Sequence, residues 1–221
     1  MENRLSLYHE LMLLSLDDRA GTEFNRSYLC ALGAAVLAEL ILLERLQLTG
    51  QNEPTVEVIQ PDRLQDTIMD RVLQQIVTDS RPRSLAYWVR QASTSDLKES
   101  IVRELCRFEI LKAEEKTVWM LFSKQIYPEM DSQPEQDIKR RLEQLLFADN
   151  PQADERTLIL ASLANGANLI EHNFGVLRTA RQQQRIDDLV AQNIYGQQVK
   201  KLLQTLQHEQ FVPLLVMSMI N

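Results

Sequence analysis

The sequence has few of the residues that mark loop-rich, disulfide-bonded or nucleic-acid-binding chains. Its 221 residues include only six glycines and seven prolines, so a chain dominated by loops or low-complexity segments is excluded. The two cysteines, Cys30 and Cys106, each lie within an apolar helical pattern, so no disulfide framework or metal site is expected. The net charge of −7 argues against a nucleic-acid partner. An anionic ligand therefore requires a local basic patch.

No apolar stretch is long enough to cross a bilayer. The longest one, Leu29–Leu43, is interrupted by Glu39 and is shorter than the roughly 20 residues that a spanning helix needs. The N-terminal stretch Leu5–Leu16 contains Tyr8, His9 and Glu10, which is unlike a signal peptide. We expect a cytoplasmic protein without a membrane span, with any membrane contact peripheral and on the cytosolic face.

The motifs of common catalytic and cofactor sites are missing as well. There is no glycine-rich phosphate loop, no zinc-binding His-Glu-x-x-His helix and no Gly-x-Ser-x-Gly elbow. His9 and His172 each lie beside a glutamate, but neighbours on a helix point in different directions. We therefore expect packed or solvated histidines, no cofactor and no enzymatic activity.

The periodicity of apolar residues predicts a mainly α fold over residues 1–221. We expect one compact helical domain, in which buried central helices are surrounded by amphipathic helices, plus a short β-hairpin. Leu5–Leu16 predicts an amphipathic helix, and Leu158–Glu171 is apolar around most of its circumference, as in a buried helix. Further helices are expected at Ser27–Leu48, from a cap at Asp62 to Thr78, and at Leu85–Ala92, Asp96–Glu109, Gln136–Phe147, Asp154–Leu177, Arg185–Tyr195 and Val199–Leu206.

Two segments have the composition of strands. Val56–Ile59 alternates between apolar and polar residues, and Thr117–Phe122 is β-branched and aromatic, as in a hairpin strand. Its bulky residues cannot all point to one side of a strand. They are covered on both faces by the core, or one face contacts a second subunit or the headgroup region of a membrane. The candidate contact residues are Val118, Trp119, Leu121 and Phe122.

Several segments together resemble the Golgi phosphoprotein 3 family of membrane-associated adaptors. The helix ending Leu37–Leu46, the segment Asp66–Leu73 and the segment Leu169–Phe174 are similar to family elements and follow in the family's order. The resemblance extends from Leu5 to about Ile220. It implies a compact helical domain with a protruding β-hairpin and no enzymatic activity. It also implies binding to phosphatidylinositol 4-phosphate at the Golgi, where family members hold glycosyltransferases by linking them to a vesicle coat.

The headgroup pocket implied by the resemblance is kept only in part. The family's aromatic position falls on or next to Phe24, and its second-helix arginine falls on Gly33. Two paired arginines fall on Ser95 and Lys98, so two cations are lost and one is kept. Losing two charge-assisted hydrogen bonds weakens headgroup binding by roughly 10² to 10⁴ fold. We expect a divergent, bacterial-type member of the family with a degraded pocket.

Two hypotheses about function follow. In the first, the chain is a peripheral membrane adaptor that docks on an anionic, phosphoinositide-like headgroup. In the second, it is a soluble homo-oligomeric scaffold that keeps the fold but has lost lipid binding, with the hairpin and the C-terminal segment as subunit contacts. Arg26 and Arg103 are close enough in the pattern to replace the lost cations, and the alternative is that both are solvated surface residues. The candidate headgroup residues are thus Phe24, Arg26, Lys98 and Arg103.

Overall fold

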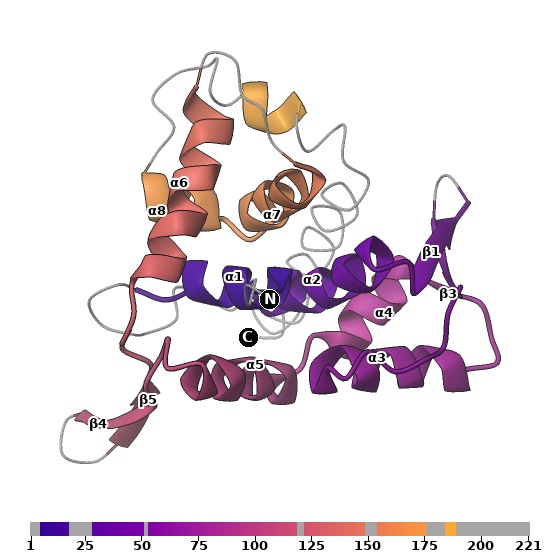
Figure 1. Ribbon diagram of the computed structural model, residues 1–221, viewed down its shortest axis with the longest axis horizontal. Coiled ribbons are helices and arrows are strands. Elements are labelled where there is room, and N and C mark those ends of the chain that lie inside the picture. Colours follow the sequence, from indigo (N-terminus) through magenta and orange to yellow (C-terminus); the bar gives the residue numbers. More distant parts are fainter. Residues whose placement is uncertain are drawn as a thin grey trace, which may run out of the picture.

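The computed structural model describes residues 5–17, 28–50, 53–118, 122–148, 154–175 and 184–188, and the side chains of residues 116–124 lie outside this description. Within these ranges the protein is mainly helical, as predicted, with two small antiparallel sheets (Figure 1). The helices are α1 (Leu7–Leu14), α2 (Tyr28–Leu42), α3 (Thr67–Thr78), α4 (Leu85–Ala92), α5 (Ser95–Arg107), α6 (Gln133–Phe147), α7 (Glu155–Gly166) and α8 (Leu169–Phe174). The strands are β1 (Leu46–Thr49), β2 (Thr55–Val58), β3 (Arg83–Ser84), β4 (Glu114–Val118) and β5 (Phe122–Ile126).

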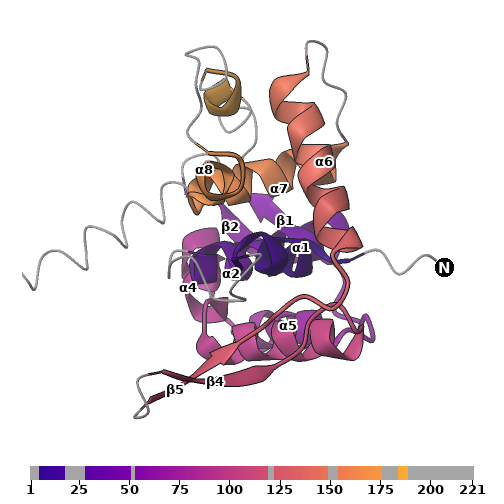
Figure 2. The same cartoon turned by 90° about the vertical axis from the view of Figure 1, so that its left-hand side faces the viewer.

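Helices α1 and α2 form the centre of the molecule. Every residue of α1 is buried, and so are all residues of α2 from Ala31 to Leu40. Both helices pack against α7, whose Ile159, Leu160 and Leu163 are fully buried. The central pair lies between a layer that contains α3 and α5 and a layer formed by α6, α7 and α8 (Figures 1 and 2). The predicted buried central helices are confirmed.

The surrounding helices bury one stripe each, as their amphipathic patterns predict. In α5 the buried residues are Leu97, Ile101, Val102 and Leu105, which recur at the three- and four-residue spacing of one helix face. Helix α5 begins at an N-cap, Thr94, whose hydroxyl accepts a hydrogen bond from the Leu97 amide at 3.2 Å.

The opening helix differs from its expected amphipathic form, because it has no solvent-facing side. His9 and Glu10 are only 3% and 2% exposed. Their polar atoms meet other helices instead of water, with His9 Nε2 3.1 Å from Glu104 and Glu10 accepting a hydrogen bond from Arg141 at 2.8 Å. Buried polar groups persist when they are paired in this way.

The second helix is shorter than predicted. It ends at Leu42 instead of Leu48, and Glu44 takes a left-handed φ of 55° that reverses the chain. The last residues of the expected helix form β1, in which Leu46 pairs with Val58 of β2. The short strand expected at Val56–Ile59 is confirmed as β2, shifted by one residue. Strand β3 completes the sheet in the order β1-β2-β3.

Two other helix boundaries also move. Asp66, rather than Asp62, caps α3, because its carboxylate accepts hydrogen bonds from the amides of Ile68 and Met69. The helix expected over Asp154–Leu177 is divided into α7 and α8, since Asn168 has a φ of 61°. Of the expected C-terminal elements only residues 184–188 are described, as a helical turn, and the segments 199–206 and 211–220 lie outside the described residues.

The predicted hairpin is confirmed, but the strand expected over Thr117–Phe122 is wrong. Strand β4 ends at Val118 and β5 begins at Phe122, and the two pair antiparallel along their full length. The hairpin projects from one end of the helical body (Figures 1 and 2). Trp119 and Leu121 lie outside the described residues, as do the side chains of Val118 and Phe122.

The described helices are short compared with the roughly 20 residues that cross a bilayer. The longest of the described helices, α2 and α6, have 15 residues each. Among the helices that the structure describes, none is both long and apolar enough to span a bilayer.

Candidate functional site

Lys98 is the predicted headgroup residue that the structure brings next to the hairpin. It lies in α5, one turn after the Thr94 cap, and is half-buried. Its Nζ stands 5.8 Å from the ring centroid of Tyr127, the residue that directly follows β5. A cation over an aromatic face is held by the ring's quadrupole. Lys98 therefore lies near both the start of α5 and the base of the hairpin.

The start of α5 adds partial positive charge to this corner. The first amides of a helix have no partners within the helix, and the helix dipole favours an anion there. Ser95 is exposed at the first position of α5 and offers a hydroxyl beside these amides. Of the first amides of α5, that of Leu97 is already bonded to the Thr94 hydroxyl, and Asp96 in the same turn adds negative charge. Lys98 is therefore the main feature of this corner that can receive a phosphate group.

Gly33 of α2 is packed too closely against α4 for any side chain. A Cβ atom at this position would overlap the hydroxyl oxygen of Ser93 and would lie 2.8 Å from the carbonyl oxygen of Val89. An arginine here would force α2 and α4 apart. The family's second-helix cation is therefore sterically excluded in this fold, and glycine is what the helix contact requires.

Arg90 is a cation near α2 that the sequence analysis missed. It is exposed in the last turn of α4. Burial raises the pKa of the Cys30 thiol. A hydrogen bond with Ser93 and the positive charge of Arg90 lower this pKa and so offset part of the rise. Arg90 is thus near enough to the first turn of α2 for its charge to act there. The helical period of residues 85–92 predicts that Arg90 points outward. Its closeness to Cys30 follows only from the packing of α2 on α4.

Among the described residues, the predicted headgroup residue Arg103 is not brought to Lys98. Arg103 is exposed on the same helix, but five positions at 3.6 residues per turn direct it to another side of α5. Phe24 and Arg26 lie outside the described residues.

The polar residues of α1 are used for internal connections. Glu104 accepts hydrogen bonds from His9 and, at 3.0 Å, from the Thr67 hydroxyl, and the bond with His9 is the main cause that lowers the pKa of Glu104. The Tyr8 hydroxyl donates to Asp66 at 2.6 Å. The pKa of Tyr8 is raised mainly by burial and, to a smaller extent, by this hydrogen bond. These contacts join α1 to α3 and α5.

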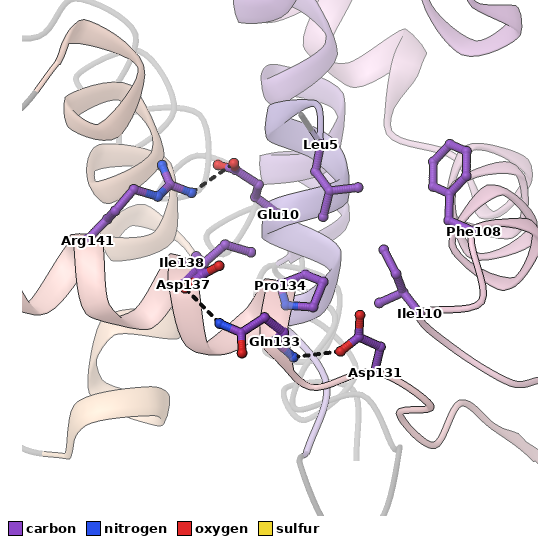
Figure 3. A pocket seen from close by; sticks show the side chains of 10 residues that line it. All are labelled: Leu5, Glu10, Phe108, Ile110, Asp131, Gln133, Pro134, Asp137, Ile138 and Arg141. Atoms are coloured by element: carbon purple, nitrogen blue, oxygen red, sulfur yellow. Dashed lines mark hydrogen bonds and ion pairs between the residues drawn. The ribbon is translucent and has the colours of Figure 1, made fainter. Parts of the chain in front are cut away.

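A groove of about 670 Å³ opens between α1, the end of α5 and the start of α6 (Figure 3). It lies beside the base of the hairpin, since Ile110 and Met130 are joined there by a 2.8 Å backbone hydrogen bond. The sequence analysis did not find it, because its residues come from segments far apart in the chain. Its lining residues are Leu5, Glu10, Phe108, Ile110, Asp131, Gln133, Pro134, Asp137, Ile138 and Arg141.

In the part of the chain that the structure describes, no group of three or more acidic, histidine or cysteine side chains is arranged to hold a metal ion.

Comparison with known proteins agrees with this fold. The family model described as Golgi phosphoprotein 3 (GPP34) matches residues 7–206. The chain belongs to the Golgi phosphoprotein 3 family. It is also similar to the vacuolar protein sorting-associated protein 74 of Eremothecium gossypii, with 24% identity over 211 residues that cover 80% of this chain. The alignment covers 63% of that curated relative, so the chain spans less than two thirds of its length.

Proposed function

We propose that this protein is a non-enzymatic peripheral membrane adaptor that binds an anionic, phosphoinositide-like headgroup. The observation that carries the proposal is the family match over residues 7–206, because the family is one of Golgi-associated membrane adaptors. The name of the fungal relative refers to vacuolar protein sorting, which supports a role in membrane traffic. In a cell with a Golgi, its place is the cytosolic face of that membrane.

The geometry supports a particular docking surface for this role. Lys98, the start of α5 and the base of the β4–β5 hairpin lie on one side of the molecule, and Arg90 adds a second cation near the first turn of α2. A phosphate monoester would pair with Lys98 and with Arg90. Arg26 is a further candidate cation, and Phe24 is a candidate aromatic contact. The hairpin residues Val118, Trp119, Leu121 and Phe122 would contact the headgroup region of the bilayer. The net charge of −7 makes such a local patch necessary.

Vesicle co-sedimentation tests the proposal. We expect binding to phosphatidylcholine vesicles that contain phosphatidylinositol 4-phosphate, little binding to phosphatidylcholine alone, and weaker binding as salt screens the charges. Lys98→Gln should lower the affinity about tenfold or more, since a charge-assisted hydrogen bond is lost. Arg140→Gln, which removes an exposed cation of α6, is the matched control. Equal sedimentation with both vesicle types at low salt would end the proposal.

Arg103→Gln resolves the role of the remaining described candidate. Because this side chain is directed away from Lys98, we expect an effect of less than about twofold, as for a solvent-exposed charge. A loss as large as that of Lys98→Gln would move the docking surface along α5 toward the groove.

A further inference from the structure

Lys98 and Tyr127 belong to two separate elements that the fold fixes against each other. Lys98 is near the start of α5 and is half-buried, whereas Tyr127 directly follows β5 and is only 5% exposed. The lysine Nζ lies over the Tyr127 ring at 5.8 Å from its centroid. This is within the distance of about 6 Å at which a ring face attracts a cation. The ring therefore favours one position of the Lys98 ammonium group.

The position of the ring is set by the backbone at the base of the hairpin. The carbonyl of Pro128, the residue after Tyr127, accepts a hydrogen bond from the Lys112 amide at 2.9 Å. Two residues before Lys112, the Ile110 amide donates to the Leu105 carbonyl of α5 at 3.0 Å. The segment that carries the ring is thus joined to α5, the helix that carries Lys98.

A lysine that binds phosphate benefits from such a contact. Its ammonium is a point charge on a flexible four-carbon stem, without the planar fork with which arginine binds phosphate. Binding therefore restricts rotamers that are free in an unsupported lysine. A contact that already holds the stem in its bound position reduces this entropic cost, as preorganisation does in general.

We propose that Tyr127 is a positioning residue of the headgroup surface, whose ring holds the Lys98 ammonium where a phosphate monoester binds. The role of Tyr127 rests on the proposed function, because the ring acts through Lys98 and does not itself touch the phosphate. It gives the base of the hairpin a part in headgroup affinity that is separate from the apolar contacts expected of residues 118–122.

Co-sedimentation with phosphatidylcholine vesicles that contain phosphatidylinositol 4-phosphate measures this effect. Tyr127→Leu removes the ring and should weaken binding about three- to fivefold. Tyr127→Phe keeps a ring that attracts cations and should bind within about twofold of the unmodified chain. The matched control is Phe108→Leu, which removes a ring whose centroid lies 5.3 Å from the Arg107 guanidinium carbon at the end of α5. It should leave binding unchanged. An equal loss in Tyr127→Phe and Tyr127→Leu would overturn the proposal.

A double-mutant cycle separates positioning of Lys98 from an effect on the hairpin. In a chain that carries Lys98→Gln, Tyr127→Leu should cause no further loss of vesicle binding, because the ring has no ammonium to hold. A further loss of the same size in that background would show that the ring acts through the fold of the hairpin. The positioning role would then be wrong.

The contact itself can be measured without lipid. Reductive methylation with ¹³C keeps the charge of the lysines, and the NMR signal of Lys98 is assigned by its loss in Lys98→Gln. The ring of Tyr127 should shift this signal upfield. The shift should persist in Tyr127→Phe and disappear in Tyr127→Leu. An unshifted signal in the unmodified chain would overturn the proposal, even if Tyr127→Leu binds vesicles weakly for another reason.

Failure of the proposed function would give a different result. Equal sedimentation of the unmodified chain with vesicles that contain the phosphoinositide and with phosphatidylcholine alone would overturn that function together with the role of Tyr127. Selective binding with the same affinity in Tyr127→Leu would overturn the role of Tyr127 alone.

Discussion

Glu39 of α2 and Arg156 of α7 form a buried ion pair with a separation of 2.7 Å between carboxylate and guanidinium. The other oxygen of Glu39 accepts the amide of Leu7 at 2.8 Å, and Arg156 also donates to the Leu5 carbonyl at 2.8 Å. One carboxylate therefore satisfies the first amide of α1 and joins three central helices. A single acidic residue inside an apolar helix has this structural role.

Removing Arg156 should destabilise the fold strongly. In Arg156→Ala, the carboxylate of Glu39 stays buried without its counter-charge, and such a loss costs about 3–5 kcal/mol. Urea denaturation followed by circular dichroism measures the change in the free energy of unfolding. Arg140→Ala removes an exposed partner of Asp137 and should cost less than about 1 kcal/mol. Similar losses in the two variants would contradict the structural role of Glu39.

The contact between Gly33 and Ser93 makes a second prediction about stability. Gly33→Ala places a methyl group against the Ser93 hydroxyl and the Val89 carbonyl, so we expect a loss of about 1–3 kcal/mol from overpacking. Ser93→Ala removes one of the two obstacles. The double variant should therefore be more stable than the sum of the single losses predicts, by at least about 0.5 kcal/mol. Additive losses in a double-mutant cycle would show that the two positions do not touch.

The sequence predicts the helices whose signals are local. Leu85–Ala92 is helical over the range that its pattern predicts, and α5 follows its Ser-Thr-Ser caps closely. The sequence predicts helix for Leu46–Leu48, because Leu-Gln-Leu can continue an apolar helical run. In the structure these residues form a strand instead, because they pair with β2.

Long-range partners are beyond such local signals. The solvent-free position of His9 depends on Glu104, and that of Glu10 depends on Arg141. The groove likewise joins Leu5 to residues near 108 and 138. For the headgroup site, the resemblance identifies Lys98, and the helical period already separates it from Arg103. The proximity of Lys98 to Tyr127 and of Arg90 to Cys30 requires the packed helices.

Changes in the hairpin distinguish the membrane adaptor from the oligomeric scaffold. The double variant Trp119→Ser with Phe122→Ser should lower vesicle binding about tenfold or more, since each large apolar side chain contributes about 1.5–3 kcal/mol when it leaves water. Its molar mass by light scattering should equal that of the unmodified chain. Thr117→Ser is a mild control in the same hairpin. A change from a multimer to a monomer, with unchanged vesicle binding, would favour the scaffold instead.

The contact between His9 and Glu104 predicts a contribution to acid sensitivity. The hydrogen bond from His9 lowers the pKa of Glu104 in the folded chain, whereas an unfolded glutamate titrates near about 4.3. Between the two pKa values only the unfolded chain holds the proton. The stabilisation is therefore complete above the pKa of the unfolded chain and is lost as the pH falls through the pKa of the folded chain.

Glu104→Gln should cost about 1–2 kcal/mol at pH 7 and should weaken the decline in the free energy of unfolding below about pH 5. Urea titrations at a series of pH values measure this, with Glu143→Gln, an exposed position of α6, as the control. A decline in Glu104→Gln as steep as in the unmodified chain would mean that the contact with His9 does not contribute.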